Sequence, residues 1–230
     1  MIKSYGAVIL ALLLVACGAP SSRPSMPRGS TSPANPPGTS GVSYRIDAAQ
    51  SELRILVYRA GPLASLGHNH VIVNRALGGW VRYAGVATAA SFSLNVPAAG
   101  FVVDDARLRR EEGADFAEDI PDDAKSGTLS NMLSAAVLDA AQFPAVTVRS
   151  VAVRATDAAL EATLAVNVAG HESTLVVPFS VDASTRRLTA SGALTMRQSA
   201  LGLTPFSVLL GALRVQDEMR VKFKFVAVAS

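Results

Sequence analysis

Residues 160–179 read LEATLAVNVAGHESTLVVPF, and this stretch decides the fold class. From Leu160 to Val168, apolar side chains alternate with polar or small ones, which is the two-residue period of a strand that buries one face. Residues 169–171 form a turn signal, after which the alternation resumes at residues 175–179. The stretch therefore predicts an antiparallel hairpin with one apolar face and one polar face.

The same period recurs along most of the chain after residue 50. The clearest runs are residues 53–57, 92–96 and 219–225, and shorter candidates are 71–73, 80–83, 146–153 and 188–196. Together they predict about eight or nine strands, most of them separated by turns that contain Gly, Asp, Asn or Pro. One apolar face per strand indicates an all-β fold built on an antiparallel sheet, either closed on itself or packed as a sandwich.

One segment departs from this pattern and predicts a helix. The acidic pair at residues 122–123 suits a helix N-terminus, where the backbone dipole favours negative charge. We expect a long loop followed by one inserted α-helix that begins near Lys125 and ends near Ala141, before Phe143-Pro144, because the residue before a proline disfavours helical backbone. The apolar residues at helical spacing are Leu129, Met132, Leu133, Ala136 and Val137.

The N-terminal segment predicts a targeting signal. Residues 1–16 carry one basic residue, Lys3, and then an apolar run. This run is shorter than the roughly 20 residues that span a bilayer. The sequence LVAC at residues 14–17 is similar to the lipobox of bacterial lipoproteins, in which the Cys is lipidated and becomes the mature N-terminus. We predict a lipoprotein signal peptide over residues 1–16 and lipidation of Cys17; the alternative is a plain secreted protein.

Residues 17–42 have the composition of a disordered tether. Six of the twelve prolines of the chain lie there, together with many Ser, Gly and Thr residues. Such a sequence has too little apolar surface to offset the entropy lost on ordering. We expect one folded domain over residues 43–229. Its stability must come from packing and hydrogen bonds, because Cys17 is the sole cysteine.

The net charge of +3 comes from the segment before residue 42. Lys3, Arg23 and Arg28 lie there without any acidic residue, so the remaining 18 basic residues balance the 18 acidic ones. A neutral domain without a basic, aromatic-interleaved run does not favour binding to nucleic acid.

Several short motifs follow one another along the expected domain. They are YRID at residues 44–47, VDD at 103–105, LDA at 138–140 with Phe143-Pro144, GHES at 170–173 and GLTPF at 202–206. In this order and spacing they resemble the YceI-like, lipocalin-like barrel family, and the resemblance spans residues 44–227. It implies an antiparallel eight-stranded lipocalin-like barrel with an apolar lumen, a periplasmic location and binding of a long isoprenoid chain.

Two segments depart from the pattern expected of that family. The stretch at residues 109–125 is longer and more acidic than the short loop that the resemblance implies. The sequence LGHNH at residues 66–70 carries two histidines, where many relatives have one or none.

His68 and His70 are the first candidate site residues. Two residues apart on a strand, they would point to the same face. Three roles stay open for the pair: hydrogen bonding within the fold, contact with the polar head of a ligand at the barrel mouth, or metal binding with His171 as a third ligand.

Asp104 and Arg107 belong to a mixed charged run at residues 104–112. Such a run is usually a solvated loop, but carboxylates beside an arginine can also line the entrance of a barrel. The candidate ligand-binding residues are therefore His68, His70, Asp104, Arg107 and His171.

An eight-stranded barrel is wide enough to be filled by its own side chains or to hold one slender ligand. Small residues such as Ala162 and Ala193 would leave room, and each buried CH₂ group of a ligand contributes ~0.8 kcal/mol. The sequence contains neither a Gly-x-Ser-x-Gly elbow, nor a phosphate-binding glycine loop, nor a His-Glu-x-x-His helix. We therefore expect neither an enzyme nor a bound cofactor.

These observations lead to one expected function and two alternatives. We expect a lipid-anchored cell-envelope barrel that binds or carries an isoprenoid-like amphiphile, such as a polyprenyl chain or a quinone, with a homodimer left open. Gly18, in place of an Asp after Cys17, predicts the periplasmic face of the outer membrane. The alternatives are a metal- or haem-handling envelope protein that uses His68, His70 and His171, and a structural or partner-binding lipoprotein whose barrel is filled by its own side chains.

Overall fold

The computed structural model describes residues 41–157 and 159–230. The expected signal peptide, Cys17 and almost all of the expected tether lie outside the described residues. Within the described ranges no helix has the length and apolar character needed to cross a membrane.

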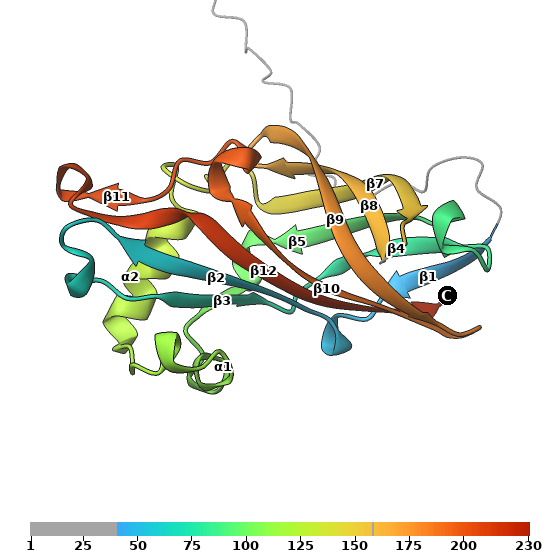
Figure 1. The fold of residues 1–230 in the computed structure, drawn as a ribbon, viewed down its shortest axis with the longest axis horizontal. Helices are drawn as coiled ribbons and strands as arrows, with labels where there is room; N and C mark the ends of the chain where they lie inside the picture. Colours follow the sequence, from blue (N-terminus) through green and yellow to red (C-terminus); the bar gives the residue numbers. More distant parts are fainter. Residues whose placement is uncertain (1–40, 158) are drawn as a thin grey trace, which may run out of the picture. The chain divides into compact units, whose positions relative to one another are not determined.

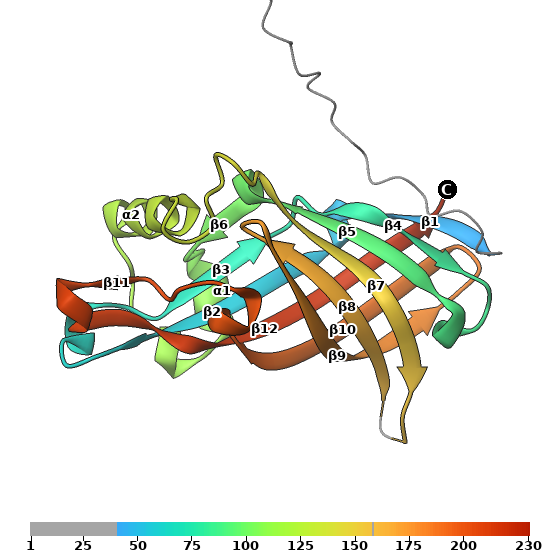
Figure 2. The same ribbon diagram turned by 90° about the horizontal axis from the view of Figure 1, so that it is seen from above.

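Eight antiparallel strands form a closed ring, as the resemblance implied (Figures 1 and 2). The ring closes because β1 pairs with β4 on one side and with the end of β12 on the other. The hairpin predicted from residues 160–179 is the β8–β9 pair. The strands of the ring are β1 (Val42–Ile46), β4 (Gly78–Tyr83), β5 (Ser91–Pro97), β7 (Ala145–Ala155), β8 (Leu160–Val168), β9 (His171–Ala183), β10 (Arg187–Arg197) and β12 (Leu213–Ala229).

The long strand β12 extends the wall beyond the ring. It pairs with β10 from Arg197 to Arg187, while its other edge is shared between β1 near the C-terminus and β2 (Glu52–Ala60) elsewhere. From β2 the sheet continues to β3 (His70–Asn74) and β6 (Phe101–Val103). The short β11 (Ser207–Val208) pairs with the start of β12. The barrel wall is therefore longer on this side, and the extension carries His70, with His68 in the loop just before it.

The inserted helix α2 is present, but its bounds differ from the expected ones. It runs over Asp122–Leu133 rather than from Lys125 to Ala141. The acidic pair lies inside the first turn, where Asp122 binds the Nζ of Lys125 at 2.8 Å. Ser134 ends the helix because its backbone is extended and its Oγ donates to the Asn131 carbonyl at 2.7 Å.

The long stretch before α2 is ordered rather than a plain loop. It holds α1 (Ala106–Glu111) and one of seven 3₁₀ turns that the described chain contains. Asp105 caps α1, since its Oδ1 accepts from the N–H groups of Arg107 and Leu108 at 3.1 and 3.0 Å. The 3₁₀ turns are η1 (Ala48–Gln50), η2 (Ala64–Leu66), η3 (Ala87–Ala89), η4 (Ala98–Gly100), η5 (Ala114–Phe116), η6 (Gln198–Leu201) and η7 (Leu209–Gly211).

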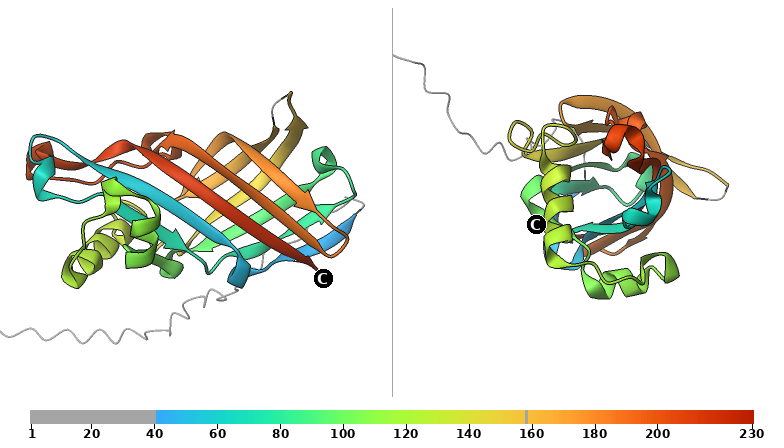
Figure 3. Two further views of the ribbon diagram at one scale, coloured as in Figure 1. Left: turned by 60° about the horizontal axis from the view of Figure 1, so that its bottom comes forward. Right: turned by 90° about the vertical axis from the view of Figure 1, so that its left-hand side faces the viewer.

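The apolar side chains divide into two clusters on opposite faces of the barrel wall. The main cluster fills the inside, where the expected inward residues of β2, such as Val57, are buried. The second cluster joins the outer faces of β2 and β3 to Leu108 of α1 and Phe116 of η5. Leu56, which the alternation assigned to the polar face, is 2% exposed because it packs with Leu108 and Phe116 of this segment. Figure 3 shows the segment against the outside of the barrel wall.

The backbone of the β8–β9 turn requires the glycine found there, Gly170. Ala169 and Gly170 both have positive φ, at 49° and 79°, as a two-residue hairpin turn of the primed type requires. A Cβ at Gly170 would lie 2.7 Å from the ring of Phe143. Glycine is therefore required here both by the backbone conformation and by the close ring.

Candidate functional site

The inside of the barrel contains an apolar cavity of about 310 Å³. None of the described side chains that line it is charged, and the only polar groups among them belong to Gln198 and Tyr83. This volume lies at the lower end of the range for sites that bind small molecules, ~300–1,000 Å³. The side chains of the barrel therefore do not fill its lumen, which argues against the self-filled alternative.

Small side chains contribute to this space, though not all of those expected. Ala162 of β8 and Ala190 of β10 line the cavity. Ala193 does not, because it lies on the exposed outer face of β10, and its assignment to the lumen was wrong. The two alanines of β10 are three residues apart, so they fall on opposite faces of the strand.

A second cavity of about 180 Å³ adjoins the lumen at the end formed by α2, η2 and η6, here called the mouth. We call this second cavity the vestibule, and its basic lining residues are Arg59, His68, His70 and Arg214. No described Asp or Glu side chain lines it. The residues shared by both cavities are Val57, Ile72, Met132, Val137 and Gln198.

His70 belongs to a buried polar network behind the vestibule. Its Nδ1 lies 2.6 Å from Oδ2 of Asp104, whose Oδ1 accepts from the Val71 N–H at 2.9 Å and from Nη1 of Arg109 at 2.6 Å. The side chains of Asp104 and Arg109 are 0% and 4% exposed. Burial acts to raise the pKa of Asp104, but the hydrogen bonds from these three partners outweigh it and hold this pKa below its ordinary value.

The network joins the histidine turn to the segment at residues 104–121. Asn69 accepts from the Arg59 N–H at 3.0 Å and donates to the Asp115 carbonyl at 3.0 Å. Arg109 donates to the Asn69 carbonyl at 2.7 Å and to the Glu118 carbonyl at 3.1 Å. The histidine turn and the long segment are therefore one structural unit, since the segment holds the turn in place.

The two neighbouring histidines both line the vestibule, although only His70 lies on a strand. Their ring centroids lie 6.2 Å apart with the ring planes at 77°. His68 precedes β3, and its Nδ1 lies 3.2 Å from Oε2 of Glu118. His70 opens β3 and binds Asp104. His70 thus combines a structural partner with a place at the vestibule wall, whereas the buried Nδ1 of His68 approaches Glu118 without forming a hydrogen bond.

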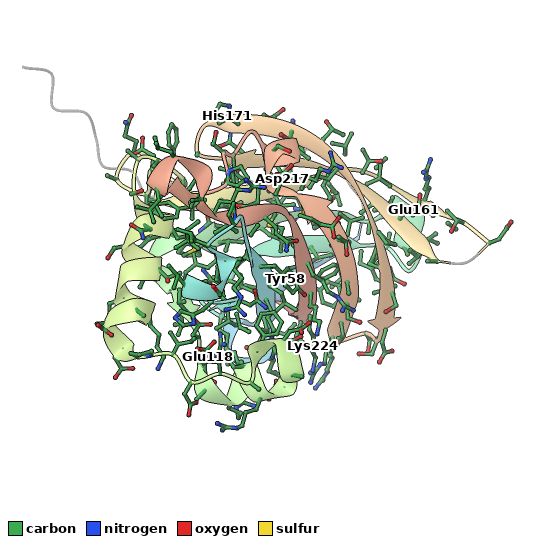
Figure 4. The ribbon with its side chains drawn as sticks, turned by 60° about the vertical axis from the view of Figure 1, so that its left-hand side comes forward. Tyr58, Glu118, Glu161, His171, Asp217 and Lys224 are labelled. Atoms are coloured by element: carbon green, nitrogen blue, oxygen red, sulfur yellow. The ribbon has the colours of Figure 1, made fainter. Side chains whose placement is uncertain are left out.

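His171 is not part of this arrangement. It begins β9, is exposed, and its side chain lies against Gly202. It lines neither cavity, and in Figure 4 it lies across the mouth from Glu118, the partner of His68. Among the described residues no three His, Cys, Asp or Glu side chains form a group suited to a metal ion. The three-histidine site of the metal or haem alternative is therefore not formed.

Arg107 also lies away from the vestibule. It is exposed and pairs with Glu111 at 3.0 Å along α1. Arg109, two residues later, occupies the buried position beside Asp104. The reason is the helical turn of α1, which directs residues 108 and 109 to the barrel and residue 107 to solvent.

The rest of the charged run holds α1 against the outside of the barrel. The side chain of Glu112 is 3% exposed and pairs with Arg54 of β2 at 2.8 Å and with Lys222 of β12. Burial acts to raise the pKa of Glu112, but the hydrogen bonds from these two cations hold it below its ordinary value. Interpreting the run as a solvated loop was therefore wrong for Asp104, Arg109 and Glu112.

The sequence interpretation missed Arg59 and Arg214 as vestibule residues. A signal for the first was present, because Arg59 continues the inward series that starts at Leu53 on β2. A cation at an inward position of an apolar strand indicates the end of the lumen. Arg214 gave no such signal. It reaches the vestibule through the pairing of β12 with β2, which only the tertiary fold decides.

Comparisons with known proteins agree with this architecture. A family model described as the YceI-like domain matches residues 44–227. A search of curated proteins finds no match to the sequence.

Solved structures share the fold at low sequence identity. BcnA from Burkholderia cenocepacia has a TM-score of 0.55 and 18% identity, covering 79% of this chain and 98% of its own. A polyisoprenoid-binding domain from Saccharophagus degradans, implicated in plant cell wall breakdown, has a TM-score of 0.55 and 13% identity, covering 82% and 99%. The YceI protein of Campylobacter jejuni has a TM-score of 0.50 and 9% identity, covering 69% and 84%.

Proposed function

The chain belongs to the family of YceI-like domains, and we propose that it binds an isoprenoid-like amphiphile, such as a polyprenyl chain or a quinone. The observation that carries this proposal is the lumen of about 310 Å³, whose described lining includes no charged side chain. The similarity to a polyisoprenoid-binding domain of Saccharophagus degradans supports the same class of ligand.

The lumen supplies the binding energy for the apolar chain of the ligand. Each CH₂ group transferred from water into it contributes ~0.8 kcal/mol before ordering costs. The lining side chains are mostly Val, Leu and Phe from alternate positions of the strands. The aromatic rings of Phe223 and Phe225 lie stacked at 5.1 Å on the lumen side of β12. A slender hydrocarbon fits such a surface better than a polar or bulky ligand.

The vestibule supplies the contacts for the polar head. Arg59 and Arg214 are donors only, so their N–H groups are available to the head of a ligand. Such a lining suits a head rich in hydrogen-bond acceptors, for example a phosphate or a quinone carbonyl. Because the two cavities adjoin through Met132, Val137 and Gln198, one molecule can occupy both.

The action proposed here is sequestration rather than turnover. The lumen offers apolar walls and no pair of described acid and base groups facing a common point within it. The protein would hold the chain out of water and release it to a membrane or a partner unchanged.

We further propose that Cys17 carries a lipid anchor and that the domain resides at the periplasmic face of the outer membrane. The support is the LVAC motif and the following Gly18. Radiolabelled palmitate should enter the protein and should not enter a Cys17→Ser variant. Equal labelling of both proteins would refute the anchor without bearing on the barrel.

Native mass spectrometry of protein extracted in mild detergent tests the ligand. We expect an added mass equal to that of an isoprenoid lipid, which organic extraction removes. A clean mass of the protein alone, from cells that contain such lipids, would count against the proposal.

A matched pair of variants on β10 makes this test specific to the lumen. Ala190→Phe places a ring in the cavity, whereas Ala193→Phe places the same ring on the exposed outer face of the same strand. The first variant should lose the bound lipid and the second should keep it. Thermal unfolding of both variants identifies any loss that comes from misfolding.

A further inference from the structure

Two loops project beside the vestibule and form what we call the apolar tip, residues 61–67 and 207–212. The first loop joins β2 to β3 and contains η2, and the second joins β11 to β12 and contains η7. The Leu63 N–H donates to the Ala212 carbonyl at 2.8 Å, which holds the two loops together. They lie at the same end of the barrel in both ribbon views (Figures 1 and 2).

The apolar tip exposes large hydrophobic side chains. Leu210 is fully exposed, and Leu66 and Leu209 are 67% and 63% exposed. Of the eleven exposed large hydrophobic residues in the described chain, five lie on these two loops. Single exposed leucines need no explanation, but a cluster on two adjoining loops indicates an interaction surface.

The backbone of the second loop is strained at both of its most exposed leucines. Leu209 and Leu210 both have positive φ, at 52° and 55°. This left-handed conformation is unfavourable for residues with a Cβ, and it is rare for two consecutive leucines. Backbone strain of this kind is typical of functional loops, where surrounding structure maintains it.

Basic groups lie directly behind the apolar tip. Arg59 and Arg214 line the vestibule at the base of the two loops, and neither has a carboxylate within 4 Å among the described residues. The sequence contains no Asp or Glu between residues 59 and 68 or between residues 201 and 215. Apolar residues in front of cations that lack a carboxylate partner match the interface of a bilayer that contains anionic lipids.

We infer that the apolar tip inserts into the surface of an anionic lipid bilayer and brings the vestibule against it. Val208 and Leu213 line the vestibule, so the apolar surface continues from the tip to the mouth. A lipid chain could then pass between bilayer and lumen without crossing water. The benefit for transfer rests on the proposed function, but insertion of the tip does not depend on what the lumen holds.

A second copy of the chain is a less suitable occupant of this surface. Stable protein interfaces bury ~800 Å² on each partner and use about 20–30 residues a side. The apolar tip consists of two short loops, residues 61–67 and 207–212. Such a narrow projection suits insertion among lipid head groups rather than a flat contact between proteins.

A tryptophan placed at the tip tests the inference on the full-length chain. The sole native tryptophan is replaced in a Trp80→Phe background, and Leu210→Trp then supplies the reporter without disturbing packing, since Leu210 is fully exposed. The matched control is Val176→Trp, at a half-exposed position on β9. Leu66→Trp provides a second tip reporter if the first variant folds poorly.

The proteins are mixed with vesicles of phosphatidylglycerol that carry bromine on the acyl chains, which quenches tryptophan fluorescence on contact. We expect at least twofold quenching at position 210 and almost none at position 176, even when the N-terminus is anchored. Vesicles of phosphatidylcholine should give much weaker quenching.

Three results would overturn the inference. They are equal quenching at positions 210 and 176, equal quenching in phosphatidylglycerol and phosphatidylcholine, and a blue shift at position 210 that depends on protein concentration without vesicles, which would indicate a second copy. The lipid found by native mass spectrometry is a separate readout, so failure of insertion and failure of ligand binding are distinguishable.

Discussion

Replacing Asp104 by Asn tests whether the buried ion pair holds the segment at residues 104–121 against the barrel. The change keeps the shape of the side chain and tolerates the left-handed backbone, at φ 57°, because Asn adopts this region as readily as Asp. It removes the negative charge that faces both Arg109 and His70.

The magnitude follows from the burial of the pair. Removing one partner of a buried ion pair costs about 3–5 kcal/mol, because the other charge is left uncompensated. Arg109 keeps two backbone acceptors, at Asn69 and Glu118, so the lower end of this range applies. We expect Asp104→Asn to lower the free energy of unfolding by about 3 kcal/mol.

Urea unfolding followed by circular dichroism measures this change. For a domain of this size about 1 kcal/mol corresponds to ~2–4 °C in Tm, so the thermal midpoint should fall by roughly 10 °C. Asp105→Asn is the matched control, because Asp105 caps α1 near the surface and Asn is an equally good N-cap. If the two variants have the same free energy of unfolding, the buried ion pair does not contribute the stability expected from its burial.

Three further predictions address pH, a turn and a buried amide. The folded-state pKa values of Asp104 and Glu112 are lowered, so their contribution to stability is present above their ordinary pKa values and is lost as pH falls through the lowered ones. The urea midpoint should therefore drop between pH 6 and pH 3, and a double variant with Asn and Gln at these positions should show a smaller drop. Gly170→Ala should lower the free energy of unfolding by about 1–3 kcal/mol, because it adds a Cβ at positive φ against Phe143; an unchanged urea midpoint would contradict this. Asn74→Ala should lower the free energy of unfolding by about 2–3 kcal/mol in the same assay. The reason is that the fully buried amide donates to the Pro97 carbonyl at 2.7 Å and accepts from the Ala76 N–H at 2.9 Å. A loss below about 1 kcal/mol would mean that water replaces the amide.

Local patterns were sufficient to predict the barrel wall. The two-residue alternation from Leu160 to Val168 reports which face is buried, and this holds wherever the chain is extended. The same pattern placed Val57 inside correctly. It failed at Leu56, because burial of an outward residue depends on whether another segment covers it. The assignment of Ala193 to the lumen was wrong because it did not follow the alternation of its own strand.

The inserted helix was predicted in kind but not in extent. Apolar spacing continues past Leu133 into Val137 and Leu138, and both of these line the lumen from the turn that follows α2. Spacing alone does not distinguish a helix from a turn that presents apolar residues to the same cavity. The hydrogen bond of Ser134 to Asn131, which ends the helix, was not visible in the pattern.

The sequence by itself determined that this protein is an antiparallel all-β domain with an apolar interior, and that two neighbouring histidines lie near each other. These properties depend on residues close in the chain, for which backbone geometry fixes the relative direction of the side chains. Only the tertiary structure decided which charges meet: Arg109 rather than Arg107 beside Asp104, Arg59 and Arg214 around the vestibule, and His171 away from it. Such contacts join residues that are distant in sequence, and a local period carries no information about which strands and helices become neighbours.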